Sequence, residues 1–168
     1  MSFFEVFAES AIAFTGLGAI HSVLAGGSSP RGAVRALLIV MLGGLAFLLS
    51  ILPLILDMLA LSSVALWRMA SAAGFLGCGG ALLLVQRLSV RFNALGYPPQ
   101  APWMLRSAYL MGTAATLAML VNLAGWPWPP GPVLYAIAVS LILTEGLVAL
   151  LHSFWIPVGL ALEETPED

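Results

Sequence analysis

Lysine is absent from this sequence, and charge of either sign is scarce. Six arginines and eight acidic residues make up 8% of its 168 residues, whereas soluble domains contain roughly 25% charged residues. Because there is no run of basic residues, the chain has no arm for binding nucleic acid or anionic lipid. Hydrophobic residues make up 61% of the chain. A soluble fold of this size cannot bury so much apolar surface, which indicates an integral membrane protein.

Cysteine and catalytic motifs are also scarce. Cys78 is the single cysteine, so an intrachain disulfide is impossible. The sequence contains no phosphate-binding or dinucleotide-binding glycine pattern, no G-x-S-x-G and no H-E-x-x-H. Asp57 is the only aspartate before the last residue, which excludes a pair of aspartates within the membrane. These absences predict a protein that is not an enzyme and that requires no metal or other cofactor.

Apolar runs separated by turn residues predict five membrane-spanning helices. The runs are about as long as the roughly 20 residues needed to cross a bilayer, and they lack the alternation of a barrel strand. We therefore expect one all-α, polytopic membrane domain. Its spans are expected at residues 4–25, 32–56, 63–86, 103–124 and 132–156, followed by a short acidic tail at 157–168. The first run carries Glu5 and Glu9 and no basic leader, so we expect a mature span rather than a signal peptide.

The placement of arginine predicts the orientation of the spans. Five of the six arginines fall on one side of the predicted membrane: Arg31, Arg35, Arg87, Arg91 and Arg106. By the positive-inside rule this side is cytoplasmic, which puts the N-terminus outside and the acidic tail inside. Arg68 falls on the other side, where its long side chain can reach the headgroups. We expect a multi-pass location, in a bacterial inner membrane.

Small residues recur every three or four positions along the first and third spans. The first stripe comprises Ala8, Ala11, Thr15, Gly18, Ser22 and Ala25, and the second comprises Ala70, Gly74, Gly77 and Ala81. In lipid, such stripes let helix backbones approach closely. We expect the following members to pack helices within one chain, with contact between copies or pore lining as alternatives: Thr15, Gly18, Ser22, Gly74 and Gly77.

Four of the titratable residues within the apolar spans are candidates for a functional role and lie at three depths: Glu9, His21, Glu145 and His152. Glu9 falls in the outer quarter of the first span, Glu145 close to the middle of the fifth, and both histidines in the inner quarters. A charge at mid-membrane costs about 2.5–3.5 kcal/mol on insertion scales. Glu145 should therefore face protein or water, and we expect it to be mostly protonated at neutral pH unless water reaches it.

These titratable residues allow several interpretations. Glu145 can hydrogen-bond a hydroxyl of the fourth span, such as that of Thr113 or Thr116, or a backbone carbonyl. It can instead belong to a polar pathway that joins the four titratable residues, or to the site of a bound ligand. The two histidines can be core or interfacial residues with hydrogen-bond partners. They can also be the axial ligands of a haem, although two ligands alone make a poor zinc site.

The main functional hypothesis is a small homo-oligomeric protein that forms a channel-like pathway for protons or small cations. Glu145 is the expected gate, Glu9 the outer mouth, and His21 and His152 the inner mouth. The expected partners are the lipid bilayer and further copies of the chain. Two alternatives stay open, namely a non-catalytic accessory or assembly subunit of a larger membrane complex and a haem-holding electron-transfer subunit.

Overall fold

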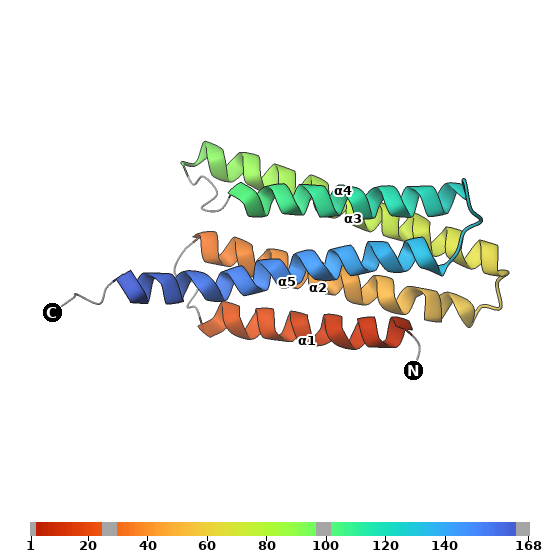
Figure 1. The fold of residues 1–168 in the computed structure, drawn as a ribbon, viewed down its shortest axis with the longest axis horizontal. Helices are drawn as coiled ribbons and strands as arrows, with labels where there is room; N and C mark the ends of the chain where they lie inside the picture. The colour runs from red at the N-terminus through yellow and green to blue at the C-terminus, as the bar shows by residue number, and fades with distance from the viewer. Residues whose placement is uncertain (1–2, 25–29, 97–101, 164–168) are drawn as a thin grey trace.

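The computed structural model describes residues 3–24, 30–96 and 102–163. Within these ranges the regular structure is helical, and every helix is long and apolar enough to cross a membrane. The helices are α1 (Phe3–Leu24), α2 (Pro30–Asp57), α3 (Ser63–Ala94), α4 (Pro102–Ala124) and α5 (Pro132–Glu163) (Figure 1). The predicted all-helical fold with five membrane-spanning segments is therefore confirmed for the described chain.

Proline, serine and glycine set the limits of these helices. Helices α2, α4 and α5 begin at a proline, whose fixed backbone angle and missing N–H suit the first turn. Ser62 caps α3, and its hydroxyl accepts a hydrogen bond from the backbone N–H of Ala65 at 3.4 Å. Gly96 and Gly125 follow α3 and α4 with φ angles of 79° and 70°, which glycine adopts at little cost.

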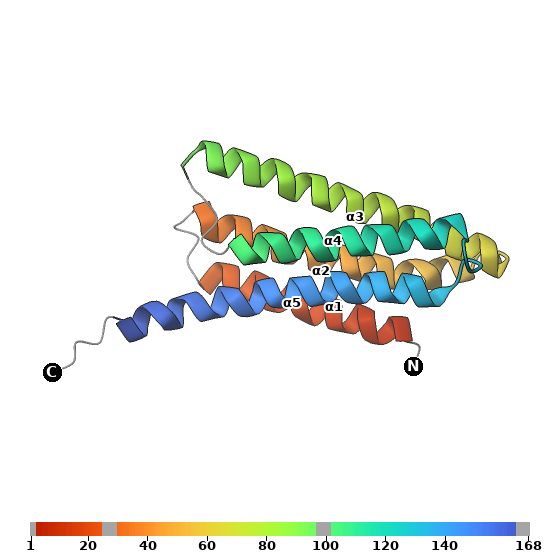
Figure 2. The same cartoon turned by 45° about the horizontal axis from the view of Figure 1, so that its top comes forward.

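The helices form one bundle with α5 at its centre. Helices α1 and α2, α3 and α4, and α4 and α5 pack as antiparallel neighbours, and α5 also packs against α1, α2 and α3 (Figures 1 and 2). The chain starts at one end of the bundle, and α5 extends past the other helices at the opposite end (Figure 1). We call these the N-terminal end and the C-terminal end. Which end is cytoplasmic stays a prediction.

Small residues let the helices approach closely. A methyl group added at Gly18 of α1 would collide with Ile39 of α2. One added at Gly74 of α3 would lie 2.7 Å from the sulfur of Met119 in α4. At Gly77 it would lie 2.8 Å from Leu45 of α2. The structure thus places these three glycines of the two predicted stripes against helices of the same chain.

Aromatic side chains fill the N-terminal end of the core. Phe4, Trp67 and Tyr135 come from α1, α3 and α5, and each ring lies within 5.9 Å of the other two, centroid to centroid. Tyr135 is completely buried. Tilted and edge-to-face ring pairs of this kind add to the packing energy of the apolar surface. This aromatic cluster closes the N-terminal end of the bundle and fixes the relative depth of three helices.

Two helices continue beyond the spans expected from the sequence. α3 runs to Ala94 instead of residue 86, and α5 runs to Glu163 instead of residue 156. The expected ends were placed where charge or proline follows an apolar run, but a helix needs only satisfied backbone groups and can continue past the apolar region. Pro53 and Pro157 therefore lie inside α2 and α5. The last five residues of the acidic tail, 164–168, lie outside the described residues.

Candidate functional site

Several serine and threonine hydroxyls within the described spans donate to their own helix. Six of them bond the carbonyl oxygen four residues earlier at 2.7 to 2.9 Å: Ser10, Thr15, Ser50, Thr116, Ser140 and Thr144. This arrangement satisfies a hydroxyl without a partner from another helix. The hydroxyl of Thr15, one member of the first small-residue stripe, is thus taken by the carbonyl of Ala11.

Asn122 joins three segments at the N-terminal end of the bundle. Its amide nitrogen donates to the hydroxyl of Ser71 in α3 at 2.8 Å and to the carbonyl of Gly131 at 3.0 Å. Its amide oxygen accepts from the N–H of Gly131 at 2.9 Å. Asn122 and Ser71 are both buried, and these bonds use most of the capacity of the amide. Asn122 therefore fastens the α4–α5 connection to α3.

Tyr135 satisfies a carbonyl that a proline has left without its helical donor. Pro53 lies four residues after Leu49 in α2 and has no N–H, so the usual hydrogen bond to the Leu49 carbonyl cannot form. The Tyr135 hydroxyl, which comes from α5, donates to this carbonyl at 2.7 Å. The bond is buried. It allows α2 to keep a proline inside the membrane without an orphaned acceptor.

Glu145 is the acidic side chain buried in the described core. It projects from α5 towards α4 and is 6% exposed. The Ser107 hydroxyl of α4 donates to its Oε1 atom at 3.4 Å, a long hydrogen bond. Its Oε2 atom is also buried and has no hydrogen-bond partner among the residues that the structure describes. The Oε1 atom thus accepts one long hydrogen bond, and the Oε2 atom accepts none from a described residue.

The partner of Glu145 is a hydroxyl of α4, as one of the hypotheses from the sequence states, but it is a different hydroxyl. Thr116 donates to its own helix, and Thr113 is exposed. Ser107 lies six residues before Thr113, about 9 Å closer to the C-terminal end. Thr113 and Thr116 lie further towards the N-terminal end of the bundle than Ser107 does. They were expected because the depth of each residue in the membrane was judged from the predicted ends of its span. Counting equal numbers of residues back from the α4–α5 connection leads to Met111, so the packing of α4 against α5 is offset by about one turn from this simple count.

His152 lies on the same side of α5 as Glu145, two turns closer to the C-terminal end. Its ring packs edge-on against Trp103 of α4, with centroids 5.5 Å apart. Trp103 in turn lies one turn before Ser107. The four side chains form two pairs between α4 and α5. Glu145 pairs with Ser107, and His152 pairs with Trp103 closer to the C-terminal end. We call this group the α4–α5 polar site.

The structure does not bring Glu9, another predicted pathway residue, to this site. Glu9 is exposed on α1, on the side that faces away from α2 and α5. No described contact joins α1 to α4, so Glu9 and Glu145 lie on different sides of the central helix. His21 belongs to α1, but its side chain lies outside the described part of the structure, as does that of Ser22.

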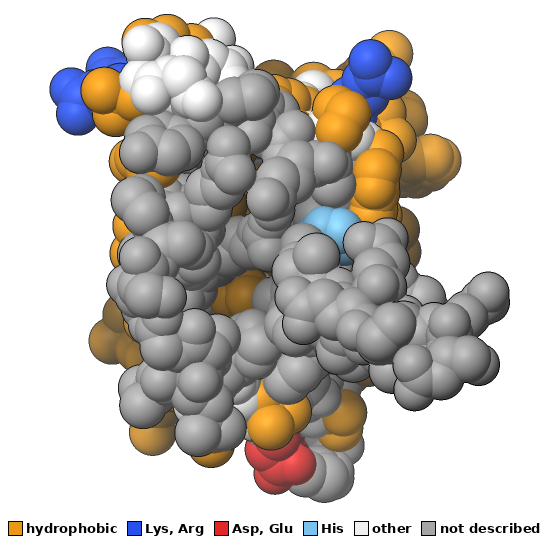
Figure 3. All heavy atoms as spheres, turned by 90° about the vertical axis from the view of Figure 1, so that its left-hand side faces the viewer, with side chains coloured by type: hydrophobic (Ala, Val, Ile, Leu, Met, Phe, Trp, Pro, Cys, Tyr) orange, Lys and Arg blue, Asp and Glu red, His pale blue; other side chains and the backbone are white. Residues whose placement is uncertain are grey.

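Arginine side chains lie at the C-terminal end, to which the polar site is closest. Figure 3 looks onto this end and shows arginine side chains at separate edges of the bundle. The arginines whose side chains are described here are exposed: Arg87, Arg91 and Arg106. Within the described residues, no group of three histidine, cysteine or acidic side chains could hold a metal ion. The polar site itself offers the carboxyl of Glu145, the hydroxyl of Ser107 and the rings of His152 and Trp103.

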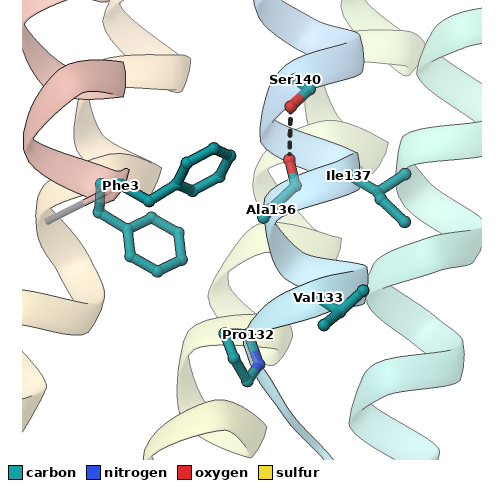
Figure 4. A pocket seen from close by; sticks show the side chains of 7 residues that line it. Phe3, Pro132, Val133, Ala136, Ile137 and Ser140 are labelled. Atoms are coloured by element: carbon teal, nitrogen blue, oxygen red, sulfur yellow. Dashed lines mark hydrogen bonds between the residues drawn. The ribbon is translucent and has the colours of Figure 1, made fainter.

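A groove at the N-terminal end provides a contrast to the polar site. It lies between the start of α1 and the first turns of α5 and is lined by apolar side chains that include Phe3, Val133 and Ile137 (Figure 4). Its one hydroxyl, that of Ser140, donates to the carbonyl of Ala136 at 2.9 Å (Figure 4). With this group already used, the groove has little to orient a polar ligand.

Comparison of the chain with protein-family models, with curated proteins and with solved structures finds no match.

Proposed function

We propose that Glu145 takes up and releases a proton or a small cation, as the binding group of a channel-like pathway. The observation that carries this proposal is the Oε2 atom of Glu145, which is buried without a hydrogen-bond partner among the described residues. A proton or a small cation is the smallest species that could neutralise this group. The Oε1 atom of the same carboxyl accepts only a long hydrogen bond, from the Ser107 hydroxyl at 3.4 Å.

The contrast with the other buried polar groups supports this function. Asn122 and Tyr135 make short hydrogen bonds that hold helices or loops together. A carboxyl kept for the same structural purpose is expected to be saturated in the same way, because an unsatisfied buried polar group costs about 1–3 kcal/mol. Intramembrane acidic residues that lack such partners are commonly part of ion or proton routes.

The position of the polar site favours access from the C-terminal end. His152 and Trp103 lie between Glu145 and this end, and a histidine can pass protons near neutral pH. Towards the N-terminal end the core is closed by Phe4, Trp67 and Tyr135. Complete passage therefore requires a movement of the helices or a route between copies of the chain. The α4–α5 polar site would serve as its C-terminal half.

Flux measurements in liposomes test the proposal. Purified protein is reconstituted alone, and proton and alkali-cation flux are recorded for the wild type and for Glu145→Gln. Glutamine keeps the shape and still accepts a hydrogen bond from Ser107, but it cannot exchange a proton. We expect at least about a tenfold loss of flux, equivalent to about 1.4 kcal/mol. Asp57→Asn, the same chemical change at an exposed position, serves as the matched control and should conduct as the wild type does.

Two results would contradict the proposal. In the first, Glu145→Gln conducts as well as the wild type and shows the same dependence on pH, which would remove Glu145 from the pathway. In the second, neither protein conducts at any tested pH or voltage, which would remove the pathway itself.

A further inference from the structure

The outward face of α1 carries a charge but packs against no described helix. Glu9, Ala13 and Gly16 are all exposed, and their spacing puts them on one face. A methyl group added at Gly16 would meet no atom within 4 Å. Glu9 lies within the apolar span Phe3–Ile20, and no ion pair joins it to a described residue. A carboxylate on a lipid-facing surface within the membrane is costly, so this face requires a partner.

The outward face of α3 also combines a charged residue with an open glycine, but its charge is positive. Arg68 is exposed, and Ala72 and Gly79 follow it on the same face, both partly exposed. A methyl group added at Gly79 would likewise meet no atom within 4 Å. Arg68 is the one arginine at the N-terminal end, and no described acidic residue pairs with it. Each of the two faces thus combines one charge with a small residue that is open to close approach.

The two faces match in depth. The rings of Phe4 in α1 and Trp67 in α3 lie 5.7 Å apart, which sets a common level. Both helices run from the N-terminal end towards the C-terminal end (Figure 1). Gly16 and Gly79 each follow 12 residues later, about 18 Å along the helix in both cases. The two open glycines therefore lie at one depth in the membrane.

The two charges are within reach of each other at this register. Glu9 follows Phe4 by five residues and Arg68 follows Trp67 by one, so their Cα atoms differ in depth by about 6 Å. Side chains on both helices lean towards the N-terminal end, so the offset between the two charged groups stays about the same. The long arginine side chain can cover the remaining distance.

We propose that a second copy of this chain docks its α1 onto α3 of the first, in parallel, with Gly16 against Gly79 and Glu9 paired with Arg68. Both charges are supplied by the same sequence, and their complementarity makes a second copy the occupant of each face. In one bundle α1 and α3 meet through the rings of Phe4 and Trp67, which lie on other faces of the two helices than Glu9 and Arg68, so the docking joins two different surfaces. Such a head-to-tail contact repeats from copy to copy and closes into a ring or continues as a chain.

Disulfide cross-linking in lipid tests the register. In a Cys78→Ala background, the double variant Gly16→Cys, Gly79→Cys should form adducts larger than dimers, because each copy offers both surfaces. Either cysteine alone should give little product. The combination of Gly16→Cys with Leu83→Cys is the matched control, since Leu83 is exposed on the same side of α3 but lies four residues further along. This offset of about 6 Å exceeds what a disulfide tolerates.

Charge reversal tests the ion pair independently. Glu9→Arg alone and Arg68→Glu alone should each weaken self-association about tenfold, and the double reversal should restore it to near the wild-type value. Fluorescence energy transfer between labelled copies in liposomes measures the association. Dimers from Gly16→Cys alone, a monomeric wild type, or a double reversal that stays weak would each overturn the proposal. So would a stoichiometric unlike partner that occupies the α1 face. None of these results depends on whether Glu145 carries protons.

Discussion

Removal of the Tyr135 hydroxyl should destabilise the bundle more when Pro53 is present than when it is replaced. In the wild type, Tyr135→Phe leaves the Leu49 carbonyl with neither its helical donor nor the donor from α5. Hydrogen bonds between membrane helices contribute about 0.6 kcal/mol on average and about 1.7 at most. Because this substitution orphans a buried acceptor, we place its cost at the upper end, at about 1.5 kcal/mol.

A second substitution separates this cause from a general loss of packing. In a Pro53→Ala background, residue 53 regains an N–H and can supply the Leu49 carbonyl from within α2. The same Tyr135→Phe change should then cost only about 0.5 kcal/mol, so the double-mutant cycle has a coupling energy of about 1 kcal/mol. Tyr109→Phe is a matched control on α4, because no hydrogen bond joins the Tyr109 hydroxyl to a described residue.

Reversible unfolding in mixed micelles, driven by an increasing fraction of a denaturing detergent, gives the free energies. Tryptophan fluorescence is a suitable signal because Trp67 packs directly on Tyr135, with ring centroids 5.7 Å apart. Equal costs of Tyr135→Phe in the two backgrounds would refute the explanation, since the Leu49 carbonyl would then be satisfied without the tyrosine. A cost no larger than that of Tyr109→Phe would refute it as well.

Two further predictions concern the packing of the bundle. Asn122→Ala should lower the free energy of unfolding by about 2–3 kcal/mol, since it leaves Ser71 and both backbone groups of Gly131 without their partner. It should also speed proteolysis of the α4–α5 connection, whereas Ser71→Ala should do neither to the same extent. Gly18→Ala should destabilise the bundle by about 1–3 kcal/mol because the added methyl group collides with Ile39. Gly16→Ala, two residues away on the open face, should change stability by less than about 0.5 kcal/mol, and unfolding in mixed micelles measures both.

The number of helices and most of their starts follow from the sequence, whereas two of their ends do not. Long apolar runs require helices in lipid, and prolines and Ser62 mark where helices begin. Arg87 and Arg91 suggest the end of the third span, but charge ends only the apolar region. Neither glycine nor proline occurs between Gly80 and Gly96, so nothing interrupts α3 before Ala94.

The burial of Glu145 also follows from the sequence, because an acidic residue inside an apolar run is costly to expose to lipid. Its partner does not, since Ser107 is brought to Glu145 by the register of α4 against α5. The pairing of Tyr135 with Leu49 is harder still to foresee, because it spans 86 positions of the chain and depends on how α2 and α5 pack. Apolar patterns report which residues face inwards, but they do not report which polar groups meet.

The degree of satisfaction separates the polar residues of this bundle into two kinds. Hydroxyls such as those of Ser50 and Thr116 bond their own helix, and Asn122 and Tyr135 bond another segment. All of these can be explained by the need to pair every polar group in lipid. Glu145 differs, because its Oε2 atom is buried without a described partner, and Ser107 holds its Oε1 atom only at 3.4 Å. A residue kept for structure would lose stability when it is replaced by leucine or glutamine. If Glu145 is retained for exchange instead, stability and flux should respond in opposite directions when it is replaced.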